Sequence, residues 1–269
     1  MSYTNLTYEI DNRINIISIN RPNNLNALNI QTFSELDHAV KSSVANPDVR
    51  LIIITGSGDK AFVAGADIKE FVNFSMEEAY ELSESGHKIL SETIESCPKP
   101  IIAAINGYCG GGGCELALAC DIRIAEKGDY TIGQMEILVG IMPGAGGTTR
   151  LARLVGPGKA LEWVLRGRTF YPEEAKAEGL VHHVVQKNVL GEAKKMASEF
   201  LDKPPFALQS IKQAIKNSWN KSTQESVDEE GDLFANLIAN DVQAIKTVSY
   251  THLRAHETGR NLVCRLLLE

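Results

Sequence analysis

The chain has 269 residues, of which 43% are hydrophobic, and a formal net charge of −7. This is enough for one large α/β domain with a sizeable core, alone or with an appendage. The acidic balance argues against a nucleic-acid surface, and no polybasic patch suggests membrane binding, so we expect neither as a partner. No apolar run reaches about 18 residues, and no basic segment precedes an apolar one at the N-terminus. We therefore expect a cytoplasmic protein.

The first half of the sequence predicts alternating strands and helices. Residues 6–10 and 14–20 read as a β-hairpin, and residues 30–44 repeat apolar side chains every three or four positions, as an amphipathic helix does. The continuous apolar runs at 50–56 and 99–107 are typical of strands buried on both faces. Together these elements predict an α/β core with parallel strand pairing.

Helices are also predicted between and after these strands. Ser75 and Glu78 form a capping-box pattern before a long helix at 76–96. After about residue 190 the pattern is helical only, with helices predicted at the ranges 190–201, 206–219 and 223–245. We therefore predict a core over residues 1–199 and a helical C-terminal subdomain over residues 200–247.

The last 22 residues, 248–269, differ in composition from the rest of the chain: they are rich in arginine, histidine and leucine and show no helical or strand periodicity. Val248 to Thr258 can be back-translated into a DNA sequence that resembles the mosaic end and adapter of a transposase-made sequencing library. We expect that the reading frame leaves the gene near Thr247 and that the native C-terminus is missing. This segment is excluded from the prediction of the fold; a genomic contig that encodes it in place would refute the interpretation.

The cysteines and histidines do not form a metal-binding pattern. The five cysteines include no CxxC pair, and Cys109, Cys114 and Cys120 lie among small apolar residues, as buried thiols in a reducing compartment do. His182 and His183 are adjacent and would point to opposite faces of an extended segment. We therefore predict no metal.

The glycine-rich segments do not match nucleotide-binding motifs. A dinucleotide-binding fingerprint would need glycine at position 115 or 116, where the chain has Glu115 and Leu116. The segment GPGKA at 156–160 lacks the serine or threonine of a phosphate-binding loop. Ser85 and Lys88 fit an SxxK pattern, but they lie in a helical stretch and are typical of a solvated helix face.

Two strand-to-helix junctions are better candidates for a site. They lie in AFVAGAD at 61–67 and in NGYCGGGGCELALACD at 106–121. Glycines at a helix start can leave backbone N–H groups unpaired, and two such ends that face each other would form an oxyanion hole. The alternative is that these glycines only let two backbones pack closely.

Two glutamates are candidates for proton transfer. Glu115 falls in the first turn of the helix after the four glycines, where the helix dipole alone would favour a carboxylate. Glu136 is a lone acid in an apolar, glycine-rich stretch, and such surroundings raise the pKa of a carboxyl group toward neutrality. Two such acids beside an oxyanion hole would suit chemistry at an activated carbonyl.

Several segments in the same order resemble the enoyl-CoA hydratase/isomerase (crotonase) family, from about residue 5 to Thr247. The matching segments are AFVAGADIKE, IIAAINGYCGGGGCELALACDI, GIMPGAGGTTRLARLVG and AEGLVHHVV. The resemblance is to the short-chain hydratases in particular. It implies a spiral of ββα units, a C-terminal helical region used for trimer contacts, and a homotrimer or a dimer of trimers (a homohexamer).

The resemblance also implies roles for individual residues. The N–H groups of Ala66 and Gly112 would hold the thioester oxygen of an acyl-CoA, and Glu115 and Glu136 would be the two catalytic acids. Glu136 lies one residue further from Glu115 than in the hydratase pattern, and Met135 replaces a frequent proline. Coenzyme A, as part of the substrate and with no separate cofactor, would lie along two segments whose residues are Asn24, Leu25, Ala27, Leu28, Ala64, Asp67, Ile68 and Lys69.

The resemblance implies hydration of trans-2-enoyl-CoA to 3-hydroxyacyl-CoA, in fatty-acid or related acyl-CoA degradation such as β-oxidation. The first alternative is another enzyme of this family, such as an enoyl-CoA isomerase that shuttles a proton with one glutamate. A more distant alternative is a non-catalytic acyl-CoA- or RNA-binding protein, against which the acidic balance and the presence of both glutamates argue.

Overall fold

The computed structural model describes residues 2–240. The chain divides into two compact units, Met1–Asp202 and Lys203–Glu269, next to the boundary predicted at residues 199 and 200. The end of the helix predicted at 223–245 and the segment interpreted as adapter sequence, 248–269, lie outside the described residues.

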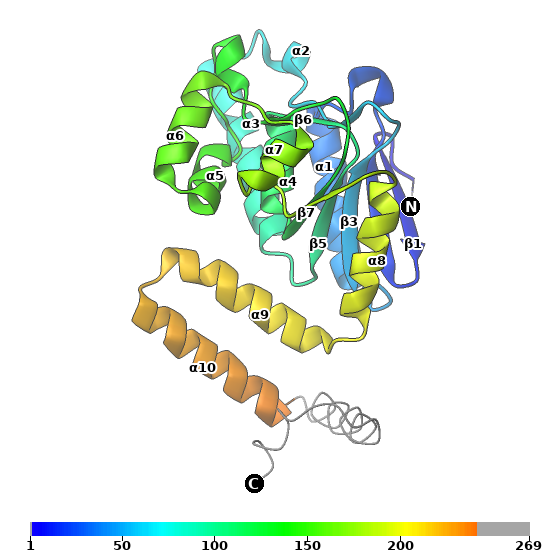
Figure 1. Cartoon of the computed structure of the whole chain (residues 1–269), viewed down its shortest axis with the longest axis vertical. Helices are drawn as coiled ribbons and strands as arrows, with labels where there is room; N and C mark the ends of the chain where they lie inside the picture. Colours follow the sequence, from blue (N-terminus) through cyan, green and yellow to red (C-terminus); the bar gives the residue numbers. More distant parts are fainter. Residues whose placement is uncertain (1, 241–269) are drawn as a thin grey trace. The chain divides into compact units, whose positions relative to one another are not determined.

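A six-stranded sheet forms the centre of the first unit (Figure 1). Its strands are β1 (Leu6–Asp11), β2 (Ile14–Ile19), β3 (Leu51–Gly56), β5 (Ile101–Ile105), β7 (Ile122–Glu126) and β9 (His183–Val185). They lie in the order β1-β2-β3-β5-β7-β9, and only the pairing of β1 with β2 is antiparallel. Asn12 and Arg13 both have positive φ, the backbone geometry of a tight two-residue hairpin turn. The predicted hairpin is therefore confirmed.

Helices cover both faces of this sheet. They are α1 (Ile30–Ala45), α3 (Met76–Lys88), η2 (Ile89–Glu95), α4 (Gly112–Ala119) and α8 (Val189–Leu201). One core lies between the sheet and α1, η2 and α4, and a second lies between the other face and α8. Because both faces are covered, the alternating sequence of β2 does not mark a solvent-facing side: Ile14 and Ile16 enter one core, Ile17 and Ile19 the other.

A second, smaller sheet repeats the order of the first. Its parallel strands β4 (Ala61–Val63), β6 (Tyr108–Gly110) and β8 (Ile132–Gly133) follow β3, β5 and β7 along the chain. The shorter segments and remaining helices are η1 (Pro22–Asn24), α2 (Ile68–Phe71), η3 (Glu136–Val139), α5 (Gly147–Val155), α6 (Pro157–Arg166) and α7 (Pro172–Ala177). Successive strand-strand-helix units thus build the predicted spiral, and they place the ends of β4 and β6 side by side.

The long helix predicted at 76–96 begins as expected and changes its hydrogen bonding on the way. The backbone N–H of Ser75 donates to the Glu78 carboxylate at 2.7 Å, and the N–H of Glu78 donates to Ser75 Oγ at 3.3 Å, which completes the capping box. From Ile89 the helix continues as the π-helical segment η2. This helix forms one wall of the cavity described below.

The described part of the second unit is helical. It contains α9 (Pro205–Asn217), the single turn η4 (Ser218–Asn220) and α10 (Thr223–Asn240), and α9 contacts α10. Asn217 Nδ2 donates to Glu229 at 2.6 Å and links the two helices. Among residues 2–240, none of the helices has the length and apolar character needed to cross a membrane.

Candidate active site

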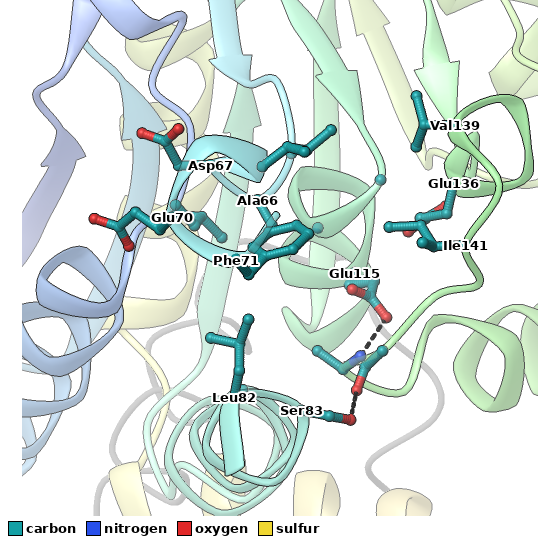
Figure 2. Close-up of a pocket in the computed structure, with 18 of the residues that line it drawn as sticks. Ala66, Asp67, Glu70, Phe71, Leu82, Ser83, Glu115, Glu136, Val139 and Ile141 are labelled. Atoms are coloured by element: carbon teal, nitrogen blue, oxygen red, sulfur yellow. Dashed lines mark hydrogen bonds between the residues drawn. The ribbon is translucent and has the colours of Figure 1, made fainter. Parts of the chain in front are cut away.

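A cavity of about 760 Å³ opens in the first unit where the ends of β4 and β6 meet the wall formed by α3. Ala66, Gly112, Glu115 and Glu136 all line it, although they come from three separate segments of the sequence. Figure 2 shows Ala66 and the two glutamates around one space. The fold therefore brings together both predicted junctions and both predicted acids.

The two junctions are close enough for their N–H groups to share one ligand atom. A Cβ placed on Gly112 would lie only 3.2 Å from the backbone nitrogen of Ala66. Hydrogen bonds on either side fix the first junction: Leu28 N–H donates to Gly65 O, and Asp67 N–H donates to Leu28 O, both at 2.8 Å. The N–H groups of Ala66 and Gly112 themselves have no acceptor within the described chain. Two free donors at one cavity wall can bind an oxygen that carries negative charge.

The four glycines at positions 110–113 have different structural roles. A Cβ on Gly113 would lie 2.0 Å from the backbone oxygen Val63 O, so this position needs glycine for close packing, whereas one on Gly110 would meet only the ends of the Met135 and Tyr108 side chains. Gly111 has a φ of 49°, a conformation that side chains disfavour. Both sequence interpretations are thus partly right: packing explains Gly113, whereas Gly112 leaves its N–H free in the cavity.

Glu115 is buried and fixed by the backbone. Its side chain projects from the first turn of α4, the residue is only 4% exposed, and its Oε1 accepts hydrogen bonds at 2.8 Å from the N–H groups of Ala145 and Gly147. Burial raises the pKa of Glu115, while these two bonds and the nearby Arg150 and His87 oppose the rise because they favour the carboxylate. The two hydrogen bonds therefore fix the Glu115 side chain in one orientation.

Glu136 has a different environment at the start of η3. Burial raises its pKa to about 7, and the charge of Glu115 adds to the rise. Its side-chain partner is Gln134: with the amide nitrogen facing the acid, Gln134 donates to the two oxygens of Glu136 at 2.8 and 3.1 Å. Glu136 lines the cavity although the spacing between the two acids is one residue longer than in the hydratase pattern and position 135 is a methionine. A carboxyl group with this pKa can carry and give a proton near neutral pH.

The two segments predicted to bind coenzyme A lie side by side. Ala64 N–H donates to Leu25 O at 3.0 Å, and Leu28 forms a parallel bridge with Ala66. Four of the predicted residues line the cavity, namely Leu28, Ala64, Asp67 and Ile68. The other four do not line it, namely Asn24, Leu25, Ala27 and Lys69. Lys69 is exposed next to the cavity-lining Ile68.

Asp67 has a structural partner that the sequence did not reveal. Its carboxylate forms an ion pair with Arg21 at 2.9 Å, and Arg21 also donates to the backbone oxygen of Ala27. Asn26 is buried and donates to Ala61 O at 2.8 Å and Ser57 O at 2.9 Å. These contacts hold the loop before α1 against the first junction.

Sequence reasoning also missed the residues that orient the two acids. The loop containing Ala145 and Gly147 holds Glu115, Gln134 contacts Glu136, and Ser83 of α3 contacts Gly144 of the same loop. The partners of Glu115 are about 30 residues away in the sequence and act mostly through the backbone. Of these residues, only Gln134 could have been predicted from the sequence as a partner of Glu136, because it lies two residues before it in the segment GQME.

The described cysteines and the pair His182 and His183 do not form a metal site. Cys97, Cys109, Cys114 and Cys120 are buried free thiols, as predicted for the last three, and Cys264 lies outside the described residues. His182 and His183 are both exposed, and His182 Nδ1 accepts a hydrogen bond from the Arg123 N–H at 3.1 Å. In the described range 2–240, no three histidine, cysteine or acidic side chains cluster as metal ligands would.

The fold and the site define an α/β protein of strand-strand-helix units with two free N–H donors beside two carboxylates. Comparison with known proteins identifies the family: residues 9–253 match the family model described as Enoyl-CoA hydratase/isomerase. The chain belongs to this family.

Individual relatives are similar over nearly their whole length. The chain is 43% identical to a crotonyl-CoA hydratase of Syntrophomonas wolfei, covering 90% of this chain and 93% of the relative. It is 35% identical to a short-chain-enoyl-CoA hydratase of Clostridium acetobutylicum, covering 97% and 100%. The crystal structure of an enoyl-CoA hydratase from Bacillus anthracis superimposes with a TM-score of 0.85 at 34% identity, covering 90% of this chain and 96% of that one. The predicted crotonase-like fold is thereby confirmed.

Proposed function

We propose that this protein is an enoyl-CoA hydratase, which adds water reversibly to a trans-2-enoyl-CoA and gives the 3-hydroxyacyl-CoA. The observation that carries the proposal is the convergence on one cavity of the N–H groups of Ala66 and Gly112 and the carboxyl groups of Glu115 and Glu136. The names of the relatives, crotonyl-CoA hydratase and short-chain-enoyl-CoA hydratase, support the same reaction and substrate class.

The two N–H groups would stabilise the charge that the reaction creates. Conjugation with the thioester makes the β-carbon electrophilic, and attack by water there moves an electron pair to the thioester oxygen. That oxygen would accept hydrogen bonds from Ala66 and Gly112, and the loss of one such donor in comparable sites costs about 3 to 4 kcal/mol of transition-state stabilisation. Gly112 begins α4, so the helix dipole supports the same charge.

The two glutamates would divide the proton transfers. Glu115, whose Oε1 is oriented by two backbone N–H groups, takes a proton from the attacking water, whose oxygen bonds to the β-carbon. Glu136, with its pKa near 7, gives a proton to the α-carbon. The electron pair of the double bond forms the new C–H bond, so one water is added, and a proton exchange between the acids and solvent restores the starting state.

The thioester's coenzyme A moiety would lie along the paired segments from Asn24 to Leu28 and from Ala64 to Lys69. The backbone of these segments is fixed by the bridge between Leu28 and Ala66 and by the Arg21–Asp67 ion pair. Lys69 lies at the exposed end and would place a positive charge near the phosphates. Coenzyme A is part of the substrate in this proposal, and no separate cofactor takes part.

The decisive experiment mixes the purified protein with crotonyl-CoA and follows the ultraviolet absorbance of the conjugated thioester. We expect rapid loss of this absorbance, and loss at least about 10²-fold slower in a matched preparation carrying Glu115→Gln. Unchanged absorbance with the well-folded protein would contradict hydratase activity and favour a non-catalytic acyl-CoA-binding protein.

An enoyl-CoA isomerase on the same fold is the second candidate, because it needs only one proton-transferring glutamate. Incubation with a 3-enoyl-CoA separates the two reactions. A hydratase leaves this unconjugated thioester largely unchanged, whereas an isomerase converts it to the 2-enoyl form and raises the absorbance. The presence of both acids on the cavity favours the hydratase.

The oligomeric state and the compartment are part of the same proposal. We propose a homotrimer, or a dimer of trimers, with contacts made by the C-terminal helical unit, and a location in the cytoplasm. In support, α9 and α10 expose large apolar side chains, among them Phe206, Ile211, Ile215 and Phe234. Light scattering on the purified chain would test the assembly; a monomer at micromolar concentration would contradict it.

A further inference from the structure

A short chain of hydrogen bonds links the helical wall of the cavity to Glu115. Ser83, in the middle of α3, donates its hydroxyl hydrogen to Gly144 O at 2.6 Å. Ala145 N–H donates to Glu115 Oε1 at 2.8 Å. Gly144 O and Ala145 N–H belong to the same peptide group, so one rigid plane carries both bonds. Figure 2 shows the two bonds in sequence from Ser83 to Glu115.

We propose that Ser83 is a positioning residue for Glu115: its hydroxyl fixes and polarises the Gly144–Ala145 peptide, which in turn orients the carboxylate. The inference rests on the proposed function, in which Glu115 is the base. A hydrogen bond accepted by a peptide oxygen strengthens the bond that the N–H of the same peptide donates. Ser83 therefore acts on the acid although it does not touch it.

The surroundings explain why this contact has an effect. The loop lies between two anchors, since Arg150 Nη1 donates to Ala145 O at 2.7 Å and Ser83 holds the preceding carbonyl. Gly144 is solvent-exposed, so without Ser83 its carbonyl would be free to turn toward water. The anchor at Arg150 is buried and paired with Glu95 at 3.0 Å, whereas the anchor at Ser83 comes from the cavity wall itself. Ser83 thus couples the helix that lines the cavity to the orientation of Glu115.

The charged and titratable groups around Glu115 set the expected pH effect. Burial raises the pKa of Glu115, and Arg150 of α5 and His87 of α3 oppose that rise. Glu136 of η3 and the neighbouring thiol of Cys114 are acidic groups close enough to interact with it. Loss of the Ser83 hydroxyl weakens the Ala145 N–H as a donor, which destabilises the carboxylate and raises the pKa of Glu115. The acidic limb of the kcat/KM profile should therefore move to higher pH.

The test compares Ser83→Ala, Ser83→Thr and the control Ser85→Ala in the full chain with crotonyl-CoA as substrate. Ser85 lies on the same helix, is exposed and does not line the cavity. We expect Ser83→Ala to lower kcat by about 3- to 10-fold, the effect of one neutral hydrogen bond, with KM nearly unchanged and the acidic limb shifted upward. Ser83→Thr, which keeps the hydroxyl, should restore most of kcat, and Ser85→Ala should behave as the unmodified protein.

Three outcomes would overturn the inference. The first is a Ser83→Ala variant with the kcat and pH profile of Ser85→Ala. The second is a Ser83→Thr variant as slow as Ser83→Ala, because the hydroxyl would then not be the cause. The third is a loss that appears in KM alone, which would indicate a wall contact with the ligand. Glu115→Gln measured in parallel separates this failure from that of the proposed function: if that variant stays active, Glu115 itself is not the base.

Discussion

The two segments that carry the acids differ in how the protein surrounds a carboxyl group. Glu115 lies in α4, whose residues are all buried, and accepts hydrogen bonds from two backbone N–H groups, one in the loop before α5 and one at the first residue of α5. Glu136 begins a short turn whose next three residues, Ile137, Leu138 and Val139, are exposed, and its side-chain contact is the amide of Gln134. Burial raises the pKa of both acids, but the backbone donors and the nearby Arg150 oppose the rise at Glu115, whereas the charge of Glu115 adds to the rise at Glu136.

The largest effect is expected from Glu115→Gln, which removes the base without changing the shape of the side chain. Activity on crotonyl-CoA should fall by about 10²- to 10⁴-fold, while binding of the thioester changes little. Steady-state kinetics together with calorimetric titration of a saturated acyl-CoA would measure both. A variant with near-normal turnover would show that Glu115 is not the base, and it would contradict the different roles assigned to the two glutamates.

Glu136→Gln should have the next largest effect and a distinct pH signature. With a pKa of about 7, the acid is protonated below neutrality and loses its proton above it, so kcat/KM of the unmodified protein should fall as pH rises through about 7. The variant should be slower by about 10²- to 10³-fold, and this alkaline limb should disappear from its profile. If the limb persists in the variant, another group is responsible for it.

Gln134→Met sharpens the comparison by removing the donor of Glu136 alone. Methionine has a similar length and cannot donate to the carboxylate, so the pKa of Glu136 should rise further and the alkaline limb should move to higher pH. We expect a loss in kcat of about 10- to 50-fold, in line with one hydrogen bond to a charged group. Thermal melting of the variant would establish that it folds, and an unshifted limb would show that Gln134 does not tune Glu136.

The smallest effect concerns stability and its dependence on pH. Because burial raises the pKa of Glu136 from about 4.5 to about 7, the contribution of its protonated form to stability is complete below about pH 4.5 and is lost as pH rises through 7. Urea unfolding of Glu136→Gln should therefore show a relative gain of about 1 to 2 kcal/mol between pH 5 and pH 9, reduced by partial solvent access. An equal difference at both pH values would argue against the raised pKa.

The sequence could predict features that depend on neighbouring residues, but not contacts between segments that are far apart in the sequence. The hairpin, the capping box at Ser75 and the position of Glu115 after four glycines depend on neighbouring residues, and all three are found in the structure. The contacts of Ser83 with Gly144 and of Ala145 with Glu115 join segments that are far apart in the sequence, and they use backbone groups, which every residue type possesses. No pattern of side chains in the sequence predicts such contacts.

The change from α3 to η2 is a second feature that the sequence did not reveal. Apolar spacing predicts one helix over 76–96, and it cannot distinguish a stretch of α-helix from one of π-helix at its end. The small sheet was equally hidden, because β8 has only two residues, Ile132 and Gly133, too few for any periodicity.

The most direct test of the account is the reaction of crotonyl-CoA in water labelled with heavy oxygen, followed by mass spectrometry of the product. The two acids and the two N–H groups are proposed to add water across the double bond, so the 3-hydroxybutyryl-CoA should carry one labelled oxygen at the β-carbon. Conversion of the substrate to any product without that label, or no conversion by the folded protein, would contradict the account.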